Sequence, residues 1–290
     1  MSENKKNGLA KNGFEVWDNY ISKKITQKIL EKSKEFFDKN INLGPAVNIA
    51  SLKSDELTTY GAARQEILKK NKNFYLHGND FKKGTNFLRN LTNGISITDP
   101  LLNIQEIFEI VSDPLLVNYA KKYLNSKKIY LGFVKLRRFF SNNLPLFDTN
   151  YFHTDDNSSK ILKCIVYLND IRTANDGAFV YVKSSHKKSM SLSDNQKKIG
   201  TYARTDDQIA HFYGEDSIIP ILGQAGTAIF ADTLGYHKGL KPLSNDRYVL
   251  YINYVLEEEY NGKGLKQKIS KNLLTNYNND EELFKFFLRV

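Results

Sequence analysis

The hydrophobic pattern of this chain changes its period at about residue 128, and this change limits the folds available to it. Before that point, apolar residues recur every three to four positions, as on one face of a helix. After it, six short runs rich in β-branched and aromatic residues follow one another, bounded by Gly, Asn, Asp or Pro. The predicted strands are 129–140, 161–168, 178–182, 217–222, 227–231 and 247–255. Strands that follow strands without helices between them predict an antiparallel sandwich or barrel.

Residues 1–125 are predicted to be mostly helical. A short apolar alternation over 13–20 predicts a first strand, after which Ser22 begins an amphipathic helix. A second helical pattern covers 55–70. Two further helices between 104 and 124 are divided at Asp113-Pro114, because Asp can cap the second helix and Pro fits its first turn.

These patterns predict one α+β domain over 1–290, mainly β with a helical N-terminal part. The strand-rich core is expected over 126–256. Within it, residues 184–216 are polar and weakly patterned, as in a lid-like insertion over one end of the core. Residues 257–290 are expected to form a helical tail.

Composition narrows the class of protein. The net charge of +10 comes from 34 lysines and only 8 arginines, and the lysines are dispersed. A nucleic-acid partner is therefore not expected, since phosphate binding favours a clustered, arginine-rich stripe. No apolar stretch is long enough to span a membrane, and the N-terminal segment lacks the apolar region of a secretory signal. The single cysteine, Cys164, fits a reducing cytoplasm.

A candidate metal site begins with His153 and Asp155, immediately before a predicted strand. In extended backbone, residues two apart project to the same face, so this imidazole and carboxylate point to a common position. His237 lies 84 residues later, between two predicted strands of the same region. Two His and one carboxylate make the facial triad of non-haem Fe(II) oxygenases. The alternative is an ordinary surface pair before a strand.

Arg247 strengthens the first interpretation. It lies ten residues after His237 at the start of the next predicted strand and is one of the few arginines. A guanidinium can hold a carboxylate with two parallel hydrogen bonds, which is how the far carboxylate of 2-oxoglutarate would be anchored.

These segments resemble the phytanoyl-CoA dioxygenase family of Fe(II)- and 2-oxoglutarate-dependent oxygenases. The resemblance covers about 135–255 and also includes the opening Gly13 to Val16 with the helix after it. Its motifs are His153-Thr154-Asp155, Leu168 to Ile171, Asn175 to Ala178, Ser184 to Lys187, Gly226 to Thr233, His237-Lys238-Gly239 and Arg247.

The resemblance implies a double-stranded β-helix, or jelly-roll, core of the cupin-like kind flanked by helices. It also implies Fe(II) bound by His153, Asp155 and His237, with 2-oxoglutarate held by Arg247 and converted to succinate as O₂ is consumed. Asp155 favours hydroxylation, because relatives that halogenate have a small residue there. Several relatives have Ser two positions after the distal His, where this chain has Gly239.

Other candidates carry two interpretations each. Lys135 and Arg137 share one face of a predicted strand, where they meet either the co-substrate or an anionic substrate, or else face solvent. Lys163 and Tyr167, on the strand after His153, have the same two alternatives, and Tyr167 is taken with Lys135 as a candidate for the co-substrate.

Candidates for substrate contact lie farther along the chain. Arg204 and Asp206 are in the polar insertion, where they contact substrate or form a salt bridge that orders it, and Asp232 precedes His237. Together these residues and the resemblance predict an oxygenase that hydroxylates an unactivated C–H bond of a small, anionic metabolite. The alternative is a non-catalytic metal-binding jelly-roll module that senses or binds a ligand. Nothing in the sequence indicates an oligomeric state.

Overall fold

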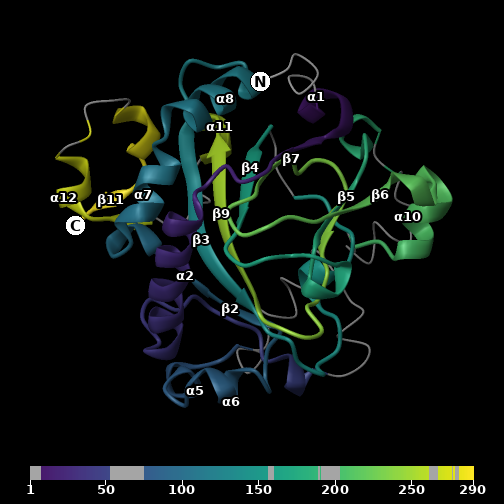
Figure 1. The fold of residues 1–290 in the computed structure, drawn as a ribbon, viewed down its shortest axis with the longest axis horizontal. Helices are drawn as coiled ribbons and strands as arrows, with labels where there is room; N and C mark the ends of the chain where they lie inside the picture. The colour runs from purple at the N-terminus through teal and green to yellow at the C-terminus, as the bar shows by residue number, and fades with distance from the viewer. Residues whose placement is uncertain are drawn as a thin grey trace.

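The computed structural model describes residues 8–52, 75–155, 160–188, 190, 203–260, 267–275, 277 and 281–290. Two sheets form its centre, with a layer of helices on the outer face of the larger one (Figure 1). The larger sheet has six antiparallel strands in the order β1-β7-β4-β9-β3-β2, and the smaller has three in the order β6-β5-β8.

Except for β2, the strands of the larger sheet follow the predicted period-two runs closely. Their bounds are β1 Phe14–Trp17, β2 Gly94–Ile97, β3 Tyr130–Phe139, β4 Leu162–Tyr167, β7 Ala228–Asp232 and β9 Arg247–Val255. The smaller sheet consists of β5 Phe179–Val182, β6 Ile218–Ile221 and β8 His237–Gly239. The predicted sandwich with an antiparallel core is confirmed, and it has the form of a jelly roll flanked by helices.

Successive side chains along each strand point to opposite faces of the larger sheet, and this divides the core into two layers. On β4, Leu162, Cys164 and Val166 pack against the helices, whereas Ile165 and Tyr167 lie between the two sheets. β9 alternates in the same way, with Leu250 and Ile252 toward the helices. The layer between the sheets therefore receives every second side chain of β3, β4 and β9, and it contains the candidate site.

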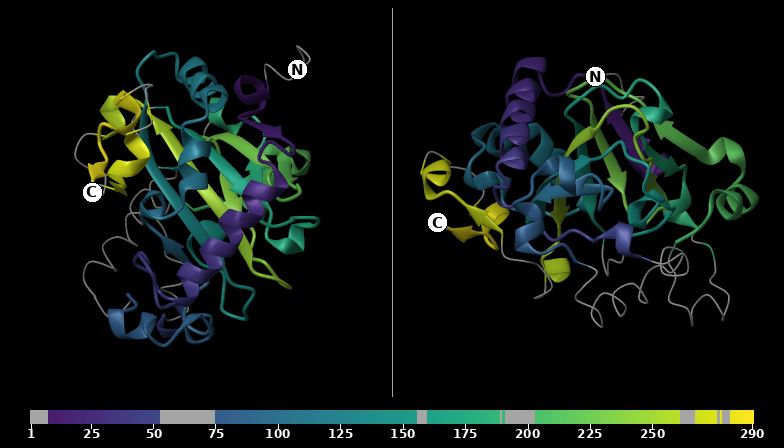
Figure 2. Two further views of the ribbon diagram at one scale, coloured as in Figure 1. Left: turned by 60° about the vertical axis from the view of Figure 1, so that its left-hand side comes forward. Right: turned by 90° about the horizontal axis from the view of Figure 1, so that it is seen from below.

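The helices of the outer layer begin where their caps predict. α2 Lys23–Asp38 starts after Ser22, whose side chain accepts a hydrogen bond from the Ile25 amide. α7 Gln105–Val111 and α8 Pro114–Leu124 divide at Asp113, which caps α8 by accepting from the Leu115 amide. Figure 2 shows α2 lying across the strands of the larger sheet. The predicted helix over 55–70 lies outside the described residues.

The N-terminal part is less purely helical than predicted. It contains the short helices α1 Gly8–Asn12, α5 Gly78–Phe81 and α6 Thr85–Leu88, but it also supplies both edge strands of the larger sheet. β1 was expected, whereas β2 was not. β2 has only four residues, and its pairing with β3 rather than its own composition defines it.

The structure adds detail to two other segments. The described part of the 184–216 insertion contains a helix, α10 Asp206–Tyr213, whose first turn is closed by a capping box between Thr205 and Gln208. The C-terminal tail is not one helix. Its described part includes α11 Glu257–Tyr260, α12 Lys271–Leu274 and a parallel pair of short strands, β10 Lys268–Ile269 and β11 Leu288–Arg289. Among the described helices, none has the length and apolar character needed to cross a bilayer.

Candidate metal centre

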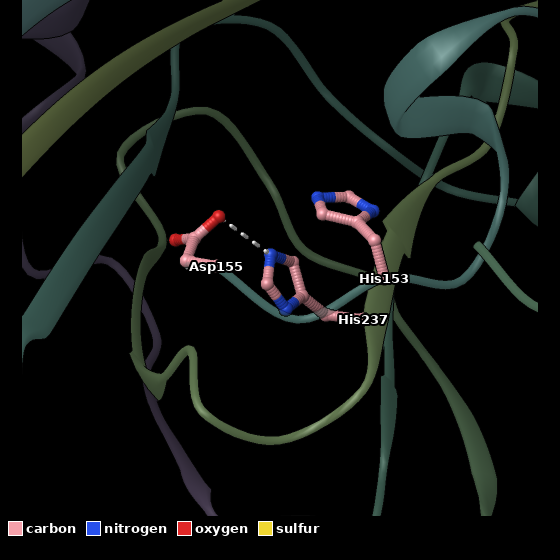
Figure 3. A group of neighbouring side chains, drawn as sticks. All are labelled: His153, Asp155 and His237. Atoms are coloured by element: carbon pink, nitrogen blue, oxygen red, sulfur yellow. Dashed lines mark ion pairs between the residues drawn. The ribbon is translucent and has the colours of Figure 1, made fainter. Parts of the chain in front are cut away.

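Three side chains from two distant segments meet between the sheets. His153, Asp155 and His237 each present a ligand atom, and these atoms lie within 4.8 Å of one another (Figure 3). The Nε2 atom of His237 is 3.7 Å from Oδ1 of Asp155. Two imidazoles and one carboxylate on one side of a common point are the donor set of a mononuclear 2-His-1-carboxylate site. The residues therefore fit one divalent ion with positions left for other ligands.

Backbone pairing brings the two histidines together. The amide of His153 donates to the carbonyl of His237 at 3.0 Å, and the amide of His237 donates to the carbonyl of His153 at 2.9 Å. Asp155 is held by its own amide, which donates to the Thr233 carbonyl at 2.9 Å. His237 was expected between strands, but it lies in β8, so the smaller sheet fixes its direction.

Each imidazole is oriented by a carbonyl two residues before it. Nδ1 of His153 is 2.9 Å from the Tyr151 oxygen, and Nδ1 of His237 is 2.9 Å from the Gly235 oxygen. A carbonyl can only accept, so Nδ1 of each ring carries the proton and Nε2 carries the free lone pair. This arrangement fixes the tautomer that a metal requires.

The local electrostatics favour the protonation states in which His237 and Asp155 can bind a metal. Burial, together with the neighbouring His153, lowers the pKa of His237 to about 3, so its ring is neutral at physiological pH. Burial alone would raise the pKa of Asp155, but Lys163 and the two histidines outweigh it and hold that pKa well below its usual value. The site thus holds a neutral imidazole and an ionised carboxylate.

Lys163 is part of this site. Its Nζ donates to Oδ2 of Asp155, and its side chain is largely buried on the inner face of β4. Because Oδ2 is engaged, Oδ1 is the carboxylate oxygen left to face the histidines. The sequence left two alternatives for Lys163, and the structure places it at the metal centre.

A cavity of about 110 Å³ opens beside the three ligands. Its wall includes Lys135, Arg137 and Lys163, with Asp155 as the only carboxylate among its lining residues. The other lining residues are Phe133, Thr149, His153, Phe179, His237, Gly239 and Tyr251. The inward alternative for Lys135 and Arg137 is the one the structure supports. Burial, with Arg137 and Lys163 nearby, lowers the pKa of Lys135 to about 8.

Arg247 is buried between the sheets with 1% of its surface exposed. Its Nη1 donates to the Gly177 carbonyl, and its guanidinium carbon lies 4.1 Å from the centre of the Phe139 ring. In the described part of the chain no carboxylate forms an ion pair with Arg247, and its Nε has no hydrogen-bond partner. A buried cation with an unused donor fits an anionic ligand.

Gly239 connects Arg247 to the cavity. It lines the cavity, and a Cβ built on it would lie 3.0 Å from Nη2 of Arg247. Arg247 is not itself among the lining residues, and Gly239, which has no side chain, is a lining residue adjacent to its guanidinium.

Two predicted site residues lie elsewhere. The hydroxyl of Tyr167 donates to the Ile221 carbonyl and accepts from the Phe179 amide, so it joins β4 to the smaller sheet and is not part of the cavity wall. The carboxylate of Asp232 accepts from the Tyr123 hydroxyl and the Leu234 amide, beneath the turn that leads to His237. Strand alternation predicts which face a side chain occupies but not its depth or its partners.

Arg204 and Asp206, the two candidate residues in the insertion, stabilise the fold around the site. Arg204 is buried, and its backbone forms a bridge with Phe152 next to His153. Asp206 lies at the start of α10 and pairs with Lys238 at 2.5 Å. The salt-bridge alternative is therefore observed for Asp206, and neither residue lines the cavity.

Comparisons with known proteins show that this chain is similar in fold to several solved structures. No protein-family model matches the chain, and no curated protein matches it by sequence. Solved structures of three proteins align over most of it. HygX from Streptomyces hygroscopicus with nickel and 2-oxoglutarate bound is 12% identical with a TM-score of 0.56, covering 93% of this chain and 91% of its own.

Two further structures have similar scores. The non-heme alpha ketoglutarate dependent epimerase SnoN from nogalamycin biosynthesis is 14% identical with a TM-score of 0.54, covering 87% of this chain and 82% of its own. EctD from S. alaskensis with 2-oxoglutarate and 5-hydroxyectoine is 15% identical with a TM-score of 0.56, covering 89% and 77%. At these identities the comparisons establish the fold.

Proposed function

We propose that this chain is an Fe(II)- and 2-oxoglutarate-dependent dioxygenase of the phytanoyl-CoA dioxygenase family. In this proposal it hydroxylates an unactivated C–H bond of a small, anionic metabolite in the cytoplasm, converting 2-oxoglutarate to succinate and CO₂. The observation that carries the proposal is the 2-His-1-carboxylate cluster of His153, Asp155 and His237 beside a cationic cavity. Two structures of the same fold support it, one with nickel and 2-oxoglutarate bound and the other with 2-oxoglutarate and 5-hydroxyectoine.

Each residue has a separate task in this chemistry. His153, Asp155 and His237 would hold the iron, which when bound activates O₂ at the expense of 2-oxoglutarate. Arg247 would bind the distal carboxylate of the co-substrate from between the sheets, through Nη2 and Nε. Lys163 orients Asp155 by holding its outer oxygen.

The remaining cavity residues set charge and exclude water. Lys135, Arg137 and Lys163 place three basic groups around one carboxylate, which favours anionic ligands. Phe133, Phe179 and Tyr251 supply the apolar part of the wall and limit access of water to the reacting groups. The dispersed lysines and the small volume of the cavity favour a small molecule over nucleic acid as substrate.

Metal and co-substrate binding test this proposal directly. Calorimetric titration of metal-free protein should show 2-oxoglutarate binding only after Mn(II) is added, and Fe(II) with O₂ should then give succinate. Asp155→Ala should abolish both signals, whereas the exposed Asp18→Ala should retain them. Iron-dependent succinate formation by Asp155→Ala would contradict the proposal. Binding without any turnover would instead support the non-catalytic ligand-binding module.

A further inference from the structure

The turn between β7 and β8, residues 233–236, contacts two of the three metal ligands through its backbone. The Thr233 carbonyl accepts a hydrogen bond from the Asp155 amide at 2.9 Å. The Gly235 carbonyl lies 2.9 Å from Nδ1 of His237. Asp155 and His237 face one another across the site (Figure 3). The relative placement of these two ligands therefore depends on the course of one short turn.

Asp232, the last residue of β7, fixes the beginning of this turn. It is buried, with 2% of its surface exposed. Its Oδ1 accepts from the Leu234 amide at 3.1 Å, and its carbonyl accepts from the Gly235 amide at 3.1 Å. An Asp side chain that accepts from an amide two residues later forms an Asx turn, which restricts the course of the backbone. Asp232 thus helps to determine where the Thr233 and Gly235 carbonyls point.

The other carboxylate oxygen of Asp232 is held from the helical layer. Oδ2 accepts from the hydroxyl of Tyr123, which lies in the last turn of α8. Burial, together with this hydrogen bond, raises the pKa of Tyr123, so its hydroxyl stays protonated and donates. The contact joins α8 to the turn that holds the metal ligands.

The donors to the Asp232 carboxylate are uncharged, which bears on what the contact contributes. In the described part of the chain, no cation forms an ion pair with this carboxylate. Taking a carboxylate out of water costs free energy, and neutral hydrogen bonds offset that cost only in part. Stability alone is therefore a weak explanation for a buried carboxylate here. Holding the turn in one position is a role that uses both of its oxygens.

Contacts from the smaller sheet hold the same turn. Tyr181 on β5 donates from its hydroxyl to the Asp232 carbonyl at 2.7 Å, and a Cβ built on Gly235 would lie 1.9 Å from that hydroxyl. Oγ of Ser185 accepts from the Tyr236 amide at 2.8 Å. The turn is thus held by α8 and by the smaller sheet. Removal of the contact from α8 should therefore let the turn shift, together with both of its ligand contacts.

We propose that Asp232 and Tyr123 are positioning residues of the metal centre. They fix the 233–236 turn, and the turn in its place directs the His237 ring and holds the Asp155 backbone. In this role neither positioning residue touches metal, co-substrate or substrate. Metal affinity is thereby coupled to α8, a helix outside the layer that contains the site. This inference rests on the proposed function, because it concerns the metal that these ligands would hold.

The other end of α8 offers a matched control. The hydroxyl of Tyr20 donates to Oδ2 of Asp113, whose Oδ1 caps the helix by accepting from the Leu115 amide. This is also a partly buried contact between Tyr and Asp. Asp113 lies about 15 Å along the helix from Tyr123, at 1.5 Å per residue. Tyr20→Phe therefore removes the same group as Tyr123→Phe, away from the turn.

Metal-free protein and its variants are titrated with Mn(II) by calorimetry, and denaturant unfolding measures their stability. Asp232→Ala is expected to weaken Mn(II) binding about tenfold, at the lower end of the effect of removing a group that orients a metal ligand. Tyr123→Phe, which leaves the Leu234 contact in place, should weaken it about threefold, the effect of one neutral hydrogen bond. Tyr20→Phe should lose stability but keep its Mn(II) affinity. The visible absorption of bound Co(II), which reports ligand geometry, should change in the first two variants alone.

A double variant separates positioning from a general loss of stability. Tyr123→Phe combined with Asp232→Ala should bind Mn(II) as Asp232→Ala alone does, because both residues act through one contact. If Asp232→Ala does not fold, Tyr123→Phe and Tyr20→Phe still decide. Equal Mn(II) affinity in these two, whether reduced or unaltered, overturns the inference. Failure of the unaltered protein to bind Mn(II) is a different result, since it contradicts the proposed function itself.

Discussion

Lys163 donates a hydrogen bond to the carboxylate of Asp155, the only acidic member of the metal centre. The contact occupies Oδ2 and leaves Oδ1 beside Nε2 of His237. Since Lys163 also lines the cavity, one side chain affects both the direction of a metal ligand and the charge presented to the co-substrate. These two effects can be separated by experiment.

Lys163→Met is expected to weaken 2-oxoglutarate binding about tenfold without lowering the affinity for Mn(II). The reason is that the ammonium attracts the dianionic co-substrate, whereas for the metal its repulsion of the cation offsets its orienting of Asp155. Calorimetry with each ligand measures both constants. Lys160→Met, at an exposed position just before β4, serves as the control and should change neither. Loss of Mn(II) affinity with unchanged 2-oxoglutarate affinity would show that Lys163 acts only by orienting Asp155.

Arg247→Lys is expected to weaken 2-oxoglutarate binding by about tenfold or more. Lysine keeps the charge but cannot form two parallel hydrogen bonds, and it loses the contact of the planar guanidinium with Phe139. Titration of Mn(II)-loaded protein with 2-oxoglutarate gives the constant. The exposed Arg172→Lys provides a matched control. Unchanged affinity in Arg247→Lys would mean that the co-substrate carboxylate does not bind at Arg247.

The affinity for 2-oxoglutarate is expected to fall as pH rises through about 8. Lys135 has its pKa lowered to about 8 by burial and by Arg137 and Lys163, so in the ligand-free protein it loses its charge above that pH. The anion binds the protonated form better, and its affinity is therefore highest below the pKa. Lys135→Gln should flatten this dependence between pH 7 and 9, while Lys128→Gln, at an exposed position, should not. A flat profile in the unaltered protein would remove Lys135 from co-substrate binding.

Gly235→Ala is expected to lower both the stability of the fold and the affinity for Mn(II). A Cβ at this position would lie 1.9 Å from the Tyr181 hydroxyl, so the turn must shift, at a cost of about 1–3 kcal/mol of unfolding free energy. The Gly235 carbonyl orients His237, and its displacement should weaken metal binding about tenfold. Denaturant unfolding and Mn(II) titration measure the two effects.

Gly78→Ala is the matched control for that change. A Cβ at Gly78 meets nothing within 4 Å, so neither stability nor metal affinity should fall. Unaltered Mn(II) affinity in a destabilised Gly235→Ala would mean that the carbonyl is not needed to orient His237.

Local sequence patterns predicted much of the fold, because they arise from interactions between residues that are close in sequence. The run from Arg247 to Val255 coincides with β9, and Asp113-Pro114 divides α7 from α8, since alternation and capping depend on neighbouring residues. β2 was missed because Gly94 to Ile97 becomes a strand only through its pairing with β3. α10 was missed although Thr205 and Gln208 have the spacing of a capping box.

The site was predictable to the extent that single residue types carry its chemistry. His153, Asp155 and His237 could be chosen because histidines are few and their spacing suits a metal. The partners of those residues were harder to foresee. The contact between Lys163 and Asp155 depends on how side chains from different segments meet, and no pattern within one segment predicts it.

The positions of β1 and β2 bear on the order in which the molecule can fold as it is synthesised. Both edges of the larger sheet come from early residues, and Phe14 of β1 pairs with Ala231 of β7. The ribosome therefore releases β1 long before its partner exists, and His237 emerges later than either. The N-terminal segment must wait unpaired until most of the chain has been made, so the long-range sheet and the metal centre are expected to form together, late and slowly.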